Sequence, residues 1–433
     1  MLPNPIIGII GVVVALSLVM LGLPLGIAFG AAGFIGIIVL RSLDTALPTL
    51  GSYLYLFTSN LTLCAIPLFI LMGQFAYYSG ISHDLFTAAN KWIGRLPGGL
   101  ASATALACTG FAACTGTSVA GAATMGVVAF PEMEKFNYSP RLSTGCIAAG
   151  GTLGILIPPS VVFIVYGVLT ETSVVDLFIA GILPGLMLSA LFIVAITIMC
   201  KLNPKLGPPG ESFTWKEKFA SLRGIWGMLM LLLLVVGGLY FGIFAPSEAG
   251  AIGAFGAFII MLTKGQLTKS NLFSTLKETT KMTAFAMLAV SGILLFITFV
   301  ALSNLASLLV SWTTALHLSP FGTLIVILAF YVPLGCIIES VGMILLTMPI
   351  VFPIIQSLGF DPVWFGVLIC VLSELSLITP PIGVNMYIVQ GVTNVPLREV
   401  ALGILPFALV LVIGVVILLF FPEIALFLPG VMK

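Results

Sequence analysis

Two stretches of the sequence place adjacent prolines beside small and hydroxyl-bearing residues. Residues 150–160 read GGTLGILIPPS and residues 373–385 read SELSLITPPIGVN. Proline removes a backbone donor and clashes with the preceding helical turn, so two in a row predict an unwound helix. The freed carbonyls, with the hydroxyls of Thr152, Ser376 and Thr379, are hard oxygen ligands that suit a small cation such as Na⁺.

A further helical segment follows each proline pair, so each break has the N-terminal end of a helix beside it. Aligned peptide dipoles leave that end partly positive, and its first backbone N–H groups have no partner within the helix. An anionic group such as a carboxylate is therefore favoured at both breaks.

The composition requires a bilayer around these segments. Of 433 residues, 60% are hydrophobic and 7% are charged, whereas a soluble domain carries about 25% charged residues. Because so few charged residues cannot cover the surface of a water-soluble fold of this size, membrane lipid must surround the chain. The formal net charge of +1 gives no basic surface for nucleic acid.

Ten segments are predicted to cross the membrane, because each supplies most of the 20 or so apolar residues that a span needs. Eight are continuous and two are interrupted: 5–22, 26–40, 61–79, 177–200, 224–244, 248–263, 282–300 and 400–421, with 142–169 and 363–390. Small residues within such helices favour close helix packing. We expect this role for Gly110, Gly121 and Gly145.

Two other apolar stretches, 97–131 and 320–356, are broken near their centres by short polar turns. The turns read CTGTS at 114–118 and GCIIES at 335–340. A limb of about 16 residues reaches about 24 Å at 1.5 Å per residue, so each turn lies deep in the membrane. Irregular backbone survives there only where it is buried in protein or lines a cavity. Both stretches are predicted to be re-entrant hairpins.

Two glutamates fall within these polar turns and breaks. A charge at the bilayer centre costs roughly 2.5–3.5 kcal/mol on insertion scales and usually has a functional partner. Glu339 and Glu374 are therefore candidates for a cation ligand, a proton carrier or an internal partner of a backbone donor. Glu248 follows Pro246 near a predicted membrane edge, where we expect a helix N-terminal cap.

Loop charges predict the orientation, because short cytoplasmic loops carry an excess of Lys and Arg. Lys91 and Arg95 precede the first hairpin, and Lys135 and Arg141 follow it, so its ends should be cytoplasmic. The basic segments 201–223 and 264–281 should be cytoplasmic too. The second hairpin is flanked by His317 and Asp361, with no Lys or Arg nearby, so it should enter from the outside.

The halves of the chain repeat each other at a constant offset. Pro158–Pro159 pairs with Pro380–Pro381, a difference of 380 − 158 = 222, and Ser118 pairs with Ser340. The opposite hairpin orientations make this an inverted repeat, which with broken helices at matching positions points to a secondary transporter. The predicted fold is an all-α polytopic membrane protein with an inverted repeat of five plus five helices. Its predicted divisions are a first repeat, a cytoplasmic linker and a second repeat: 1–200, 201–223 and 224–433.

Several motifs resemble the large membrane subunit of the tripartite ATP-independent periplasmic transporters, the DctM-like family. They are APSEA at 245–249, GTLGILIPPS at 151–160 and LITPPIGVN at 377–385, and the resemblance covers nearly the whole chain. It implies an elevator-type transporter of the bacterial inner membrane that couples uptake to Na⁺. It also implies a small four-helix membrane subunit as a separate chain, and a periplasmic binding protein that delivers an organic acid, such as a C4-dicarboxylate or sialic acid.

The resemblance also implies site residues, carried over by position. The first Na⁺ site would use Thr115, Gly116, Thr117, Ser118, Gly150, Gly151, Thr152 and Gly154. The second would use Gly335, Glu339, Ser340, Ser373, Glu374, Ser376 and Thr379. Substrate would lie by Pro158, Pro159, Ser160, Pro380, Pro381, Gly383 and Asn385. The chain departs from the family pattern where Glu339 replaces an expected aspartate and Thr117 an expected serine.

In the mechanism this implies, the hairpins and broken helices slide as one domain past a scaffold that includes amphipathic pieces near 42–58 and 264–280. Two alternatives stay open, a proton-coupled carrier that uses Glu339 or Glu374 and a passive channel. A membrane-embedded enzyme needs a nucleophile–base or metal constellation at membrane depth. The two histidines are far apart, and the sequence has no HExxH motif and no acidic cluster, so no catalytic role is expected.

Overall fold

The computed structural model describes residues 3–305, 307, 308, 311, 319–336, 338–380 and 383–432, with the backbone alone for 54 and 56–58. Within these ranges the chain forms nineteen α-helices and no strand. The first ten are α1 Asn4–Met20, α2 Leu25–Leu40, α3 Leu43–Ser59, α4 Ala65–Tyr78, α5 Ile81–Ile93, α6 Gly99–Thr115, α7 Ser118–Lys135, α8 Pro140–Leu153, α9 Val161–Thr170 and α10 Val174–Leu202. The others are α11 Trp215–Tyr240, α12 Pro246–Thr263, α13 Lys269–Leu302, α15 Pro320–Gly335, α16 Ser340–Ser357, α17 Pro362–Ile378, α18 Val384–Thr393, α19 Leu397–Phe420 and α20 Glu423–Met432.

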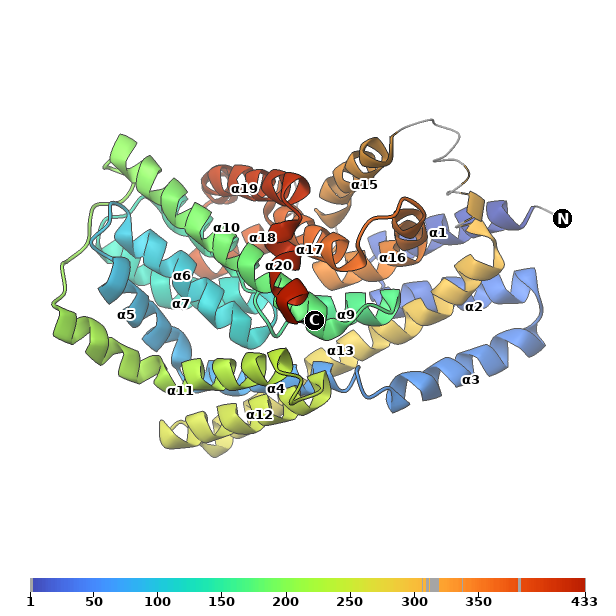
Figure 1. Cartoon of the computed structure of the whole chain (residues 1–433), viewed down its shortest axis with the longest axis horizontal. Coiled ribbons are helices and arrows are strands. Elements are labelled where there is room, and N and C mark those ends of the chain that lie inside the picture. Colours follow the sequence, from blue (N-terminus) through green and yellow to red (C-terminus); the bar gives the residue numbers. More distant parts are fainter. Residues whose placement is uncertain are drawn as a thin grey trace.

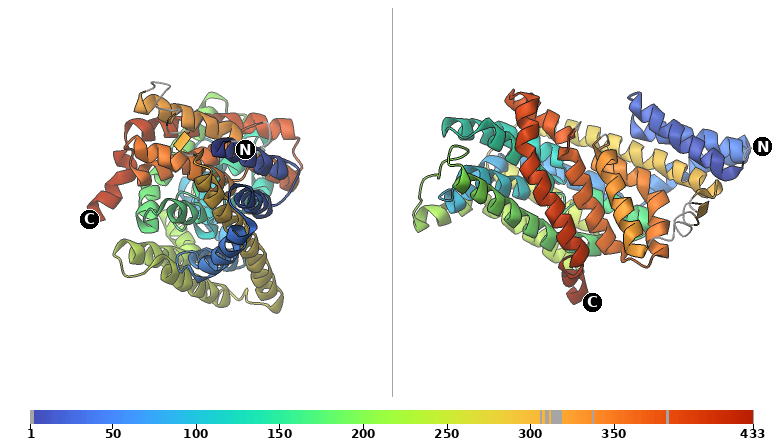
Figure 2. Two further views of the ribbon diagram at one scale, coloured as in Figure 1. Left: turned by 90° about the vertical axis from the view of Figure 1, so that its right-hand side faces the viewer. Right: turned by 90° about the horizontal axis from the view of Figure 1, so that it is seen from above.

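The helices pack in two groups. The hairpin bundle comprises α6–α10 and α15–α20: α6 and α7 pack against α8, α15 and α16 against α17, and α8 packs against α19. The scaffold group comprises α1–α4 and α11–α13, where the long α13 packs along α2 and α4 (Figure 1). Helix α5 joins the groups, because it packs against both α6 and α11. Figure 2 shows α13 and α19 as long rods in different parts of the molecule.

The predicted hairpins and broken helices are present. The first hairpin is α6 and α7, and the second is α15 and α16. Helix α7 covers 118–135 and α16 covers 340–357, so the bounds differ by 340 − 118 = 357 − 135 = 222. The helix pairs α8/α9 and α17/α18 are broken at the proline pairs. The fold is therefore the expected all-α polytopic architecture, whereas its division at 201–223 and its orientation stay predictions.

Two expected segments are described further by the structure. The expected amphipathic piece near 264–280 is the N-terminal part of α13, which runs unbroken for 34 residues from Lys269 to Leu302. The predicted linker 201–223 is partly helical, because α11 begins at Trp215. Thr214 caps α11 with a reciprocal capping box, in which its hydroxyl accepts from the Glu217 N–H and the Glu217 carboxylate accepts from the Thr214 N–H.

The described helices include six that are long and apolar enough to cross a membrane, or seven if the bent pair α4 and α5 is one span. Several pack closely through glycine, as expected. A Cβ on Gly145 would lie 2.1 Å from the Gly403 carbonyl oxygen, and one on Gly292 would lie 1.9 Å from that of Gly26. The expected cap at Glu248 is confirmed, since its carboxylate accepts from the Ala245 N–H at 2.8 Å.

Candidate functional site

The first hairpin tip rests on the first helix break. Gly116 turns the chain with φ +67°, in the left-handed region that favours glycine. A Cβ added to Gly116 would lie 3.3 Å from the Pro159 carbonyl oxygen, and one on Gly151 would lie 2.9 Å from that of Ser118. The backbone of the tip therefore lies close to the backbone of the break, the two segments that the family resemblance pairs in one site. Gly150 and Gly154 pack against the α6 residues Cys108 and Ala112.

The second tip rests on the second broken helix in the same way. A Cβ on Gly335 would lie 1.9 Å from the Ser376 Oγ. The Cys336 thiol donates to the Val332 carbonyl oxygen at 3.2 Å and also lies 3.9 Å from the Pro380 carbonyl oxygen. Helix α18 begins after Gly383, which has φ +47°. The predicted substrate residue Pro381 lies outside the described residues.

Serines from both hairpins meet at the carboxyl group of Glu374. The Ser340 hydroxyl donates to Glu374 Oε1 at 2.8 Å, and the side chain is 1% exposed. Ser118 of the first hairpin also lies beside this carboxyl group, and its position plus 222 is 340. The other oxygen, Oε2, is buried and has no hydrogen-bond partner among the described residues. The two repeats thus bring their tips to one acidic centre.

Four of the predicted hydroxyl ligands donate hydrogen bonds to helix carbonyls. Thr152 donates to the Ala149 oxygen at 2.6 Å and Thr379 to the Leu375 oxygen at 2.6 Å. Ser373 and Ser376 donate to carbonyls of α17 in the same way. A hydroxyl oxygen keeps two lone pairs while it donates a hydrogen bond. These oxygens therefore stay available to a cation.

A cavity of about 460 Å³ lies between the hairpin bundle and the scaffold group. The bundle contributes Thr117, Val119, Val161, Glu339, Val341, Gly342 and Val384. The scaffold group contributes Leu25, Ile70, Lys281, Met282, Phe285, Ala286 and Ala289. The bundle residues come from the first turns of four helices, since Thr117 precedes α7, Glu339 precedes α16, and Val161 and Val384 begin α9 and α18.

The residues that line the cavity at the two breaks are sequence neighbours of the predicted substrate residues. Val161 and Val384 line it, and each immediately follows a predicted residue. Ser160 instead caps α9, accepting from the Phe163 N–H at 3.3 Å. Asn385 is fully buried and donates to the Ala148 carbonyl oxygen at 3.3 Å, and its own Oδ1 has no partner within the described chain. Pro158 and Pro159 are buried at the break.

Sequence reasoning missed the scaffold wall of the cavity, most of which α13 supplies from Lys281 to Ala289. Those residues form an ordinary apolar run, and only the packing of α13 beside the hairpin tips gives them a role. Lys281 was the one available signal, because it is a charge at the start of a predicted span.

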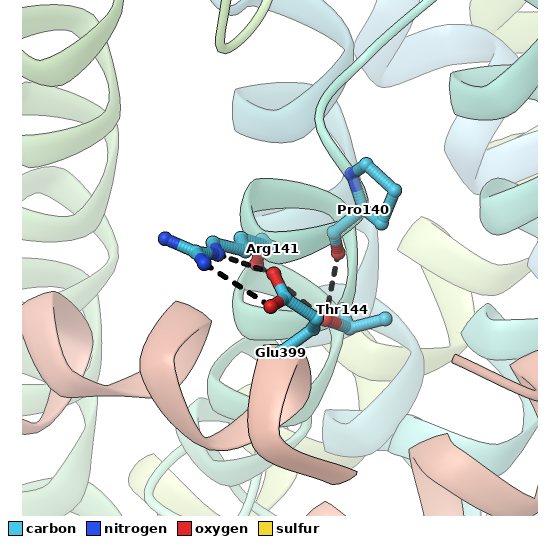
Figure 3. A network of polar contacts seen from close by, with 4 residues as sticks. All are labelled: Pro140, Arg141, Thr144 and Glu399. Atoms are coloured by element: carbon cyan, nitrogen blue, oxygen red, sulfur yellow. Dashed lines mark hydrogen bonds and ion pairs between the residues drawn. The ribbon is translucent and has the colours of Figure 1, made fainter. Parts of the chain in front are cut away.

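An ion pair outside the cavity joins the two halves of the hairpin bundle (Figure 3). Arg141, in the first turn of α8, pairs with Glu399 in the first turn of α19 through Nε and Oε2. A second hydrogen bond runs from Arg141 Nη2 to Glu399 Oε1 at 3.1 Å. Both side chains are solvent-accessible, so the pair belongs to the surface of the helix contact and not to the cavity.

Comparison with known proteins agrees with this architecture. The family model "Tripartite ATP-independent periplasmic transporter, DctM component" matches residues 12–424. The C4-dicarboxylate TRAP transporter large permease DctM of Pseudomonas aeruginosa is 37% identical over 86% of this chain and 87% of its own. The sialic acid TRAP transporter large permease SiaM of Vibrio cholerae is 31% identical over 86% of each. The Alcanivorax borkumensis YdaH transporter shares the fold with a TM-score of 0.65 at 17% identity, over 87% of this chain and 88% of that one.

Proposed function

Because this chain belongs to the DctM component family of the tripartite ATP-independent periplasmic transporters, it is a multi-pass inner-membrane permease and not an enzyme, and we propose that it takes up an organic acid together with Na⁺. The observation that carries the proposal is the cavity whose wall includes the first turns of α7, α9, α16 and α18. Each half of the chain supplies two of these four helix ends.

The cavity favours an anionic substrate. The N-terminal end of a helix carries a partial positive charge and free N–H donors. With four such ends on one wall, a carboxylate finds several donors and no need for a buried partner charge. The opposite wall is largely apolar, with Ile70, Phe285 and Ala286, and such a wall suits the carbon skeleton of a small acid. The two relatives carry different acids, so the proposal names the class alone.

Sodium binds where each hairpin tip meets its broken helix. At the second tip, Glu374 offers a buried carboxylate oxygen with no described partner, and Ser340 offers a hydroxyl oxygen beside it. At the first tip, the Thr115–Ser118 turn and the break at 154–160 offer hydroxyl and carbonyl oxygens. Such hard oxygen donors suit Na⁺, by the logic that holds for other hard cations.

Glu339 supplies a physical reason for coupling. Its side chain lines the same cavity as the four helix ends, and an ionised carboxylate there repels an incoming carboxylate. A cation bound at the second tip offsets that charge over a short distance in a medium of low dielectric constant. Substrate therefore binds better after Na⁺, and by linkage Na⁺ binds better with substrate present.

Transport follows if the hairpin bundle moves against the scaffold group and carries the bound ions and acid across. Two Na⁺ with one monoanion move one net charge, worth about 2.3 kcal/mol per 100 mV, so the membrane potential assists uptake. With a dianion the charges cancel and only the Na⁺ gradient drives the step. A periplasmic binding protein delivers the acid, and a small membrane subunit completes the complex.

Reconstitution tests the proposal. Proteoliposomes that hold the permease with its small subunit are given the periplasmic protein and labelled succinate or N-acetylneuraminate. We expect uptake only with an inward Na⁺ gradient. Uptake that continues without Na⁺ and follows a proton gradient would favour the proton-coupled carrier. Non-saturable uptake that needs no periplasmic protein would favour the channel.

A further inference from the structure

The cavity contains one cationic side chain among its described lining residues, and it comes from the scaffold group. Lys281 lies on α13, and no described residue forms an ion pair with it. The other charged lining residue, Glu339, belongs to the second hairpin on the opposite wall. The cavity therefore has a lysine ammonium on one wall and helix N-termini on the other.

The position of Lys281 along α13 places it near a membrane boundary. From Lys281 to Leu302 is 21 residues, which is about 32 Å of helix and close to the thickness of the hydrocarbon core. The α13 residues that line the cavity run from Lys281 to Ala289, a rise of about 12 Å. Lys281 thus stands at the end of this wall, with Met282, Phe285 and Ala286 between it and the deeper part.

This arrangement offers a substrate two separate anion-binding points. We infer that Lys281 is a carboxylate-binding residue on the scaffold wall, which holds a second anionic group of the substrate while the first lies at the helix N-termini. A lysine ammonium is a flexible point charge with three donors, so it tolerates substrates of different length. A monoanion with an apolar tail would leave Lys281 unused.

The inference rests on the proposed function and adds the side of the membrane on which Lys281 contacts the substrate. Lys281 belongs to the scaffold group, whereas the four helix ends belong to the hairpin bundle. If the bundle moves as proposed, the contact with Lys281 exists only on one side of the cycle. The loop charges place residues 264–281 in the cytoplasm, so Lys281 acts on the substrate at the cytoplasmic side.

The test compares succinate with succinamate, which keeps the same carbon skeleton and replaces one carboxylate with a neutral amide. Binding of each is measured at saturating Na⁺ on the permease complex in nanodiscs. Lys281→Gln should weaken succinate binding about tenfold or more, the loss expected for one charge-assisted hydrogen bond, and change succinamate binding less than about twofold. Lys281→Arg keeps the charge and should restore most of the discrimination.

Lys277→Gln is the matched control, because it removes an exposed lysine one turn away on α13 that does not line the cavity. It should leave both affinities unchanged. The inference is overturned if Lys281→Gln weakens both compounds equally, if it weakens neither, or if the wild type binds no succinate. Discrimination that depends on Lys281 in a permease without Na⁺-driven uptake would overturn the proposed function and leave the lysine assignment intact.

Discussion

The two hairpin sites share a backbone plan and differ in charge. Each tip packs on its own broken helix, and α7 and α16 have the same bounds after the offset of 222. The position that holds Glu374 in the second half holds Thr152 in the first, since 374 − 222 = 152. The Thr152 hydroxyl donates a hydrogen bond to the Ala149 carbonyl oxygen, whereas the Glu374 carboxyl group accepts from Ser340 and lies beside Ser118. The first half therefore supplies no carboxylate of its own at this position, and we call its tip the neutral site and the tip of the half that carries Glu374 the acidic site.

The scaffold group shows a second departure from symmetry. In the first half a turn separates α3 from α4, and Asn60 makes that turn by accepting from the N–H groups of Thr62 and Leu63 at 2.9 and 3.3 Å. Asparagine side chains that bond nearby backbone compete with the helix ladder. The equivalent position is Met282, since 60 + 222 = 282, and methionine favours helix. Helix α13 therefore runs through and supplies five of the seven scaffold residues that line the cavity, whereas α4 supplies Ile70 alone.

The largest expected effect comes from removing the negative charge of Glu374, which distinguishes the two sites. Glu374→Gln keeps the size of the side chain and its contact with Ser340 but loses the negative charge. Loss of one charge-assisted ligand contact corresponds to roughly tenfold to a hundredfold. We expect the Na⁺ concentration for half-maximal uptake to rise by that factor, measured in proteoliposomes with purified, monodisperse protein.

Glu339→Gln is the comparison variant for Glu374→Gln. Because Glu339 lines the cavity and repels the substrate, its neutralisation should raise substrate binding in the absence of Na⁺ and so weaken the coupling. An unchanged Na⁺ requirement in Glu374→Gln would show that the acidic site and the neutral site do not differ in cation binding. It would contradict the claim that the charge of Glu374 distinguishes them.

An intermediate effect should distinguish the two tips. Gly335→Ala places a methyl group 1.9 Å from the Ser376 Oγ and 2.6 Å from its Cβ, so the second hairpin must shift away from the helix that carries Glu374. Overpacking of this kind costs about 1–3 kcal/mol. We expect the half-saturating Na⁺ concentration to rise more than about tenfold.

Gly116→Ala is the matched change at the first tip. Its methyl group would meet nothing closer than the Pro159 oxygen at 3.3 Å, so the cost is mainly the positive φ of 67°, about 1–2 kcal/mol for a residue with a side chain. We expect a lower thermal midpoint with a Na⁺ dependence within about threefold of wild type. Equal Na⁺ shifts in both variants would contradict the assignment of the second tip as the more crowded cation site.

The smallest effect should come from the ion pair between α8 and α19. The equivalent residues on the other side of the repeat are Val363 and Leu177, so Arg141–Glu399 is present at one of two related contacts. Exposed ion pairs contribute little. In a double-mutant cycle of Arg141→Ala and Glu399→Ala, we expect the coupling to shift the thermal midpoint by less than about 2 °C. A much larger coupling would mean that the Arg141–Glu399 pair, although it is present at only one of the two related contacts, holds the hairpin bundle together.

The sequence by itself determined where the backbone breaks. The prolines at 158–159 and 380 disfavour a continuous helix at the two breaks, because proline lacks an N–H and clashes with the preceding turn. Single prolines such as Pro131, Pro184 and Pro406 lie within helices, so it is the proline pairs beside small and hydroxyl-bearing residues that marked the breaks. Gly116 allows the left-handed turn at the first tip. These are local effects, so pattern and spacing were enough to predict both hairpins and both broken helices, whereas the site residues at their contacts came from the family resemblance.

Only the tertiary structure decided which of these groups share a space. The meeting of Ser118 and Ser340 at Glu374 depends on how two distant hairpins pack together. The placing of Lys281 opposite Glu339 depends on how an apolar helix lies beside the hairpin tips. Contacts between distant segments follow from the packing of whole helix faces, and no local spacing in the chain records them.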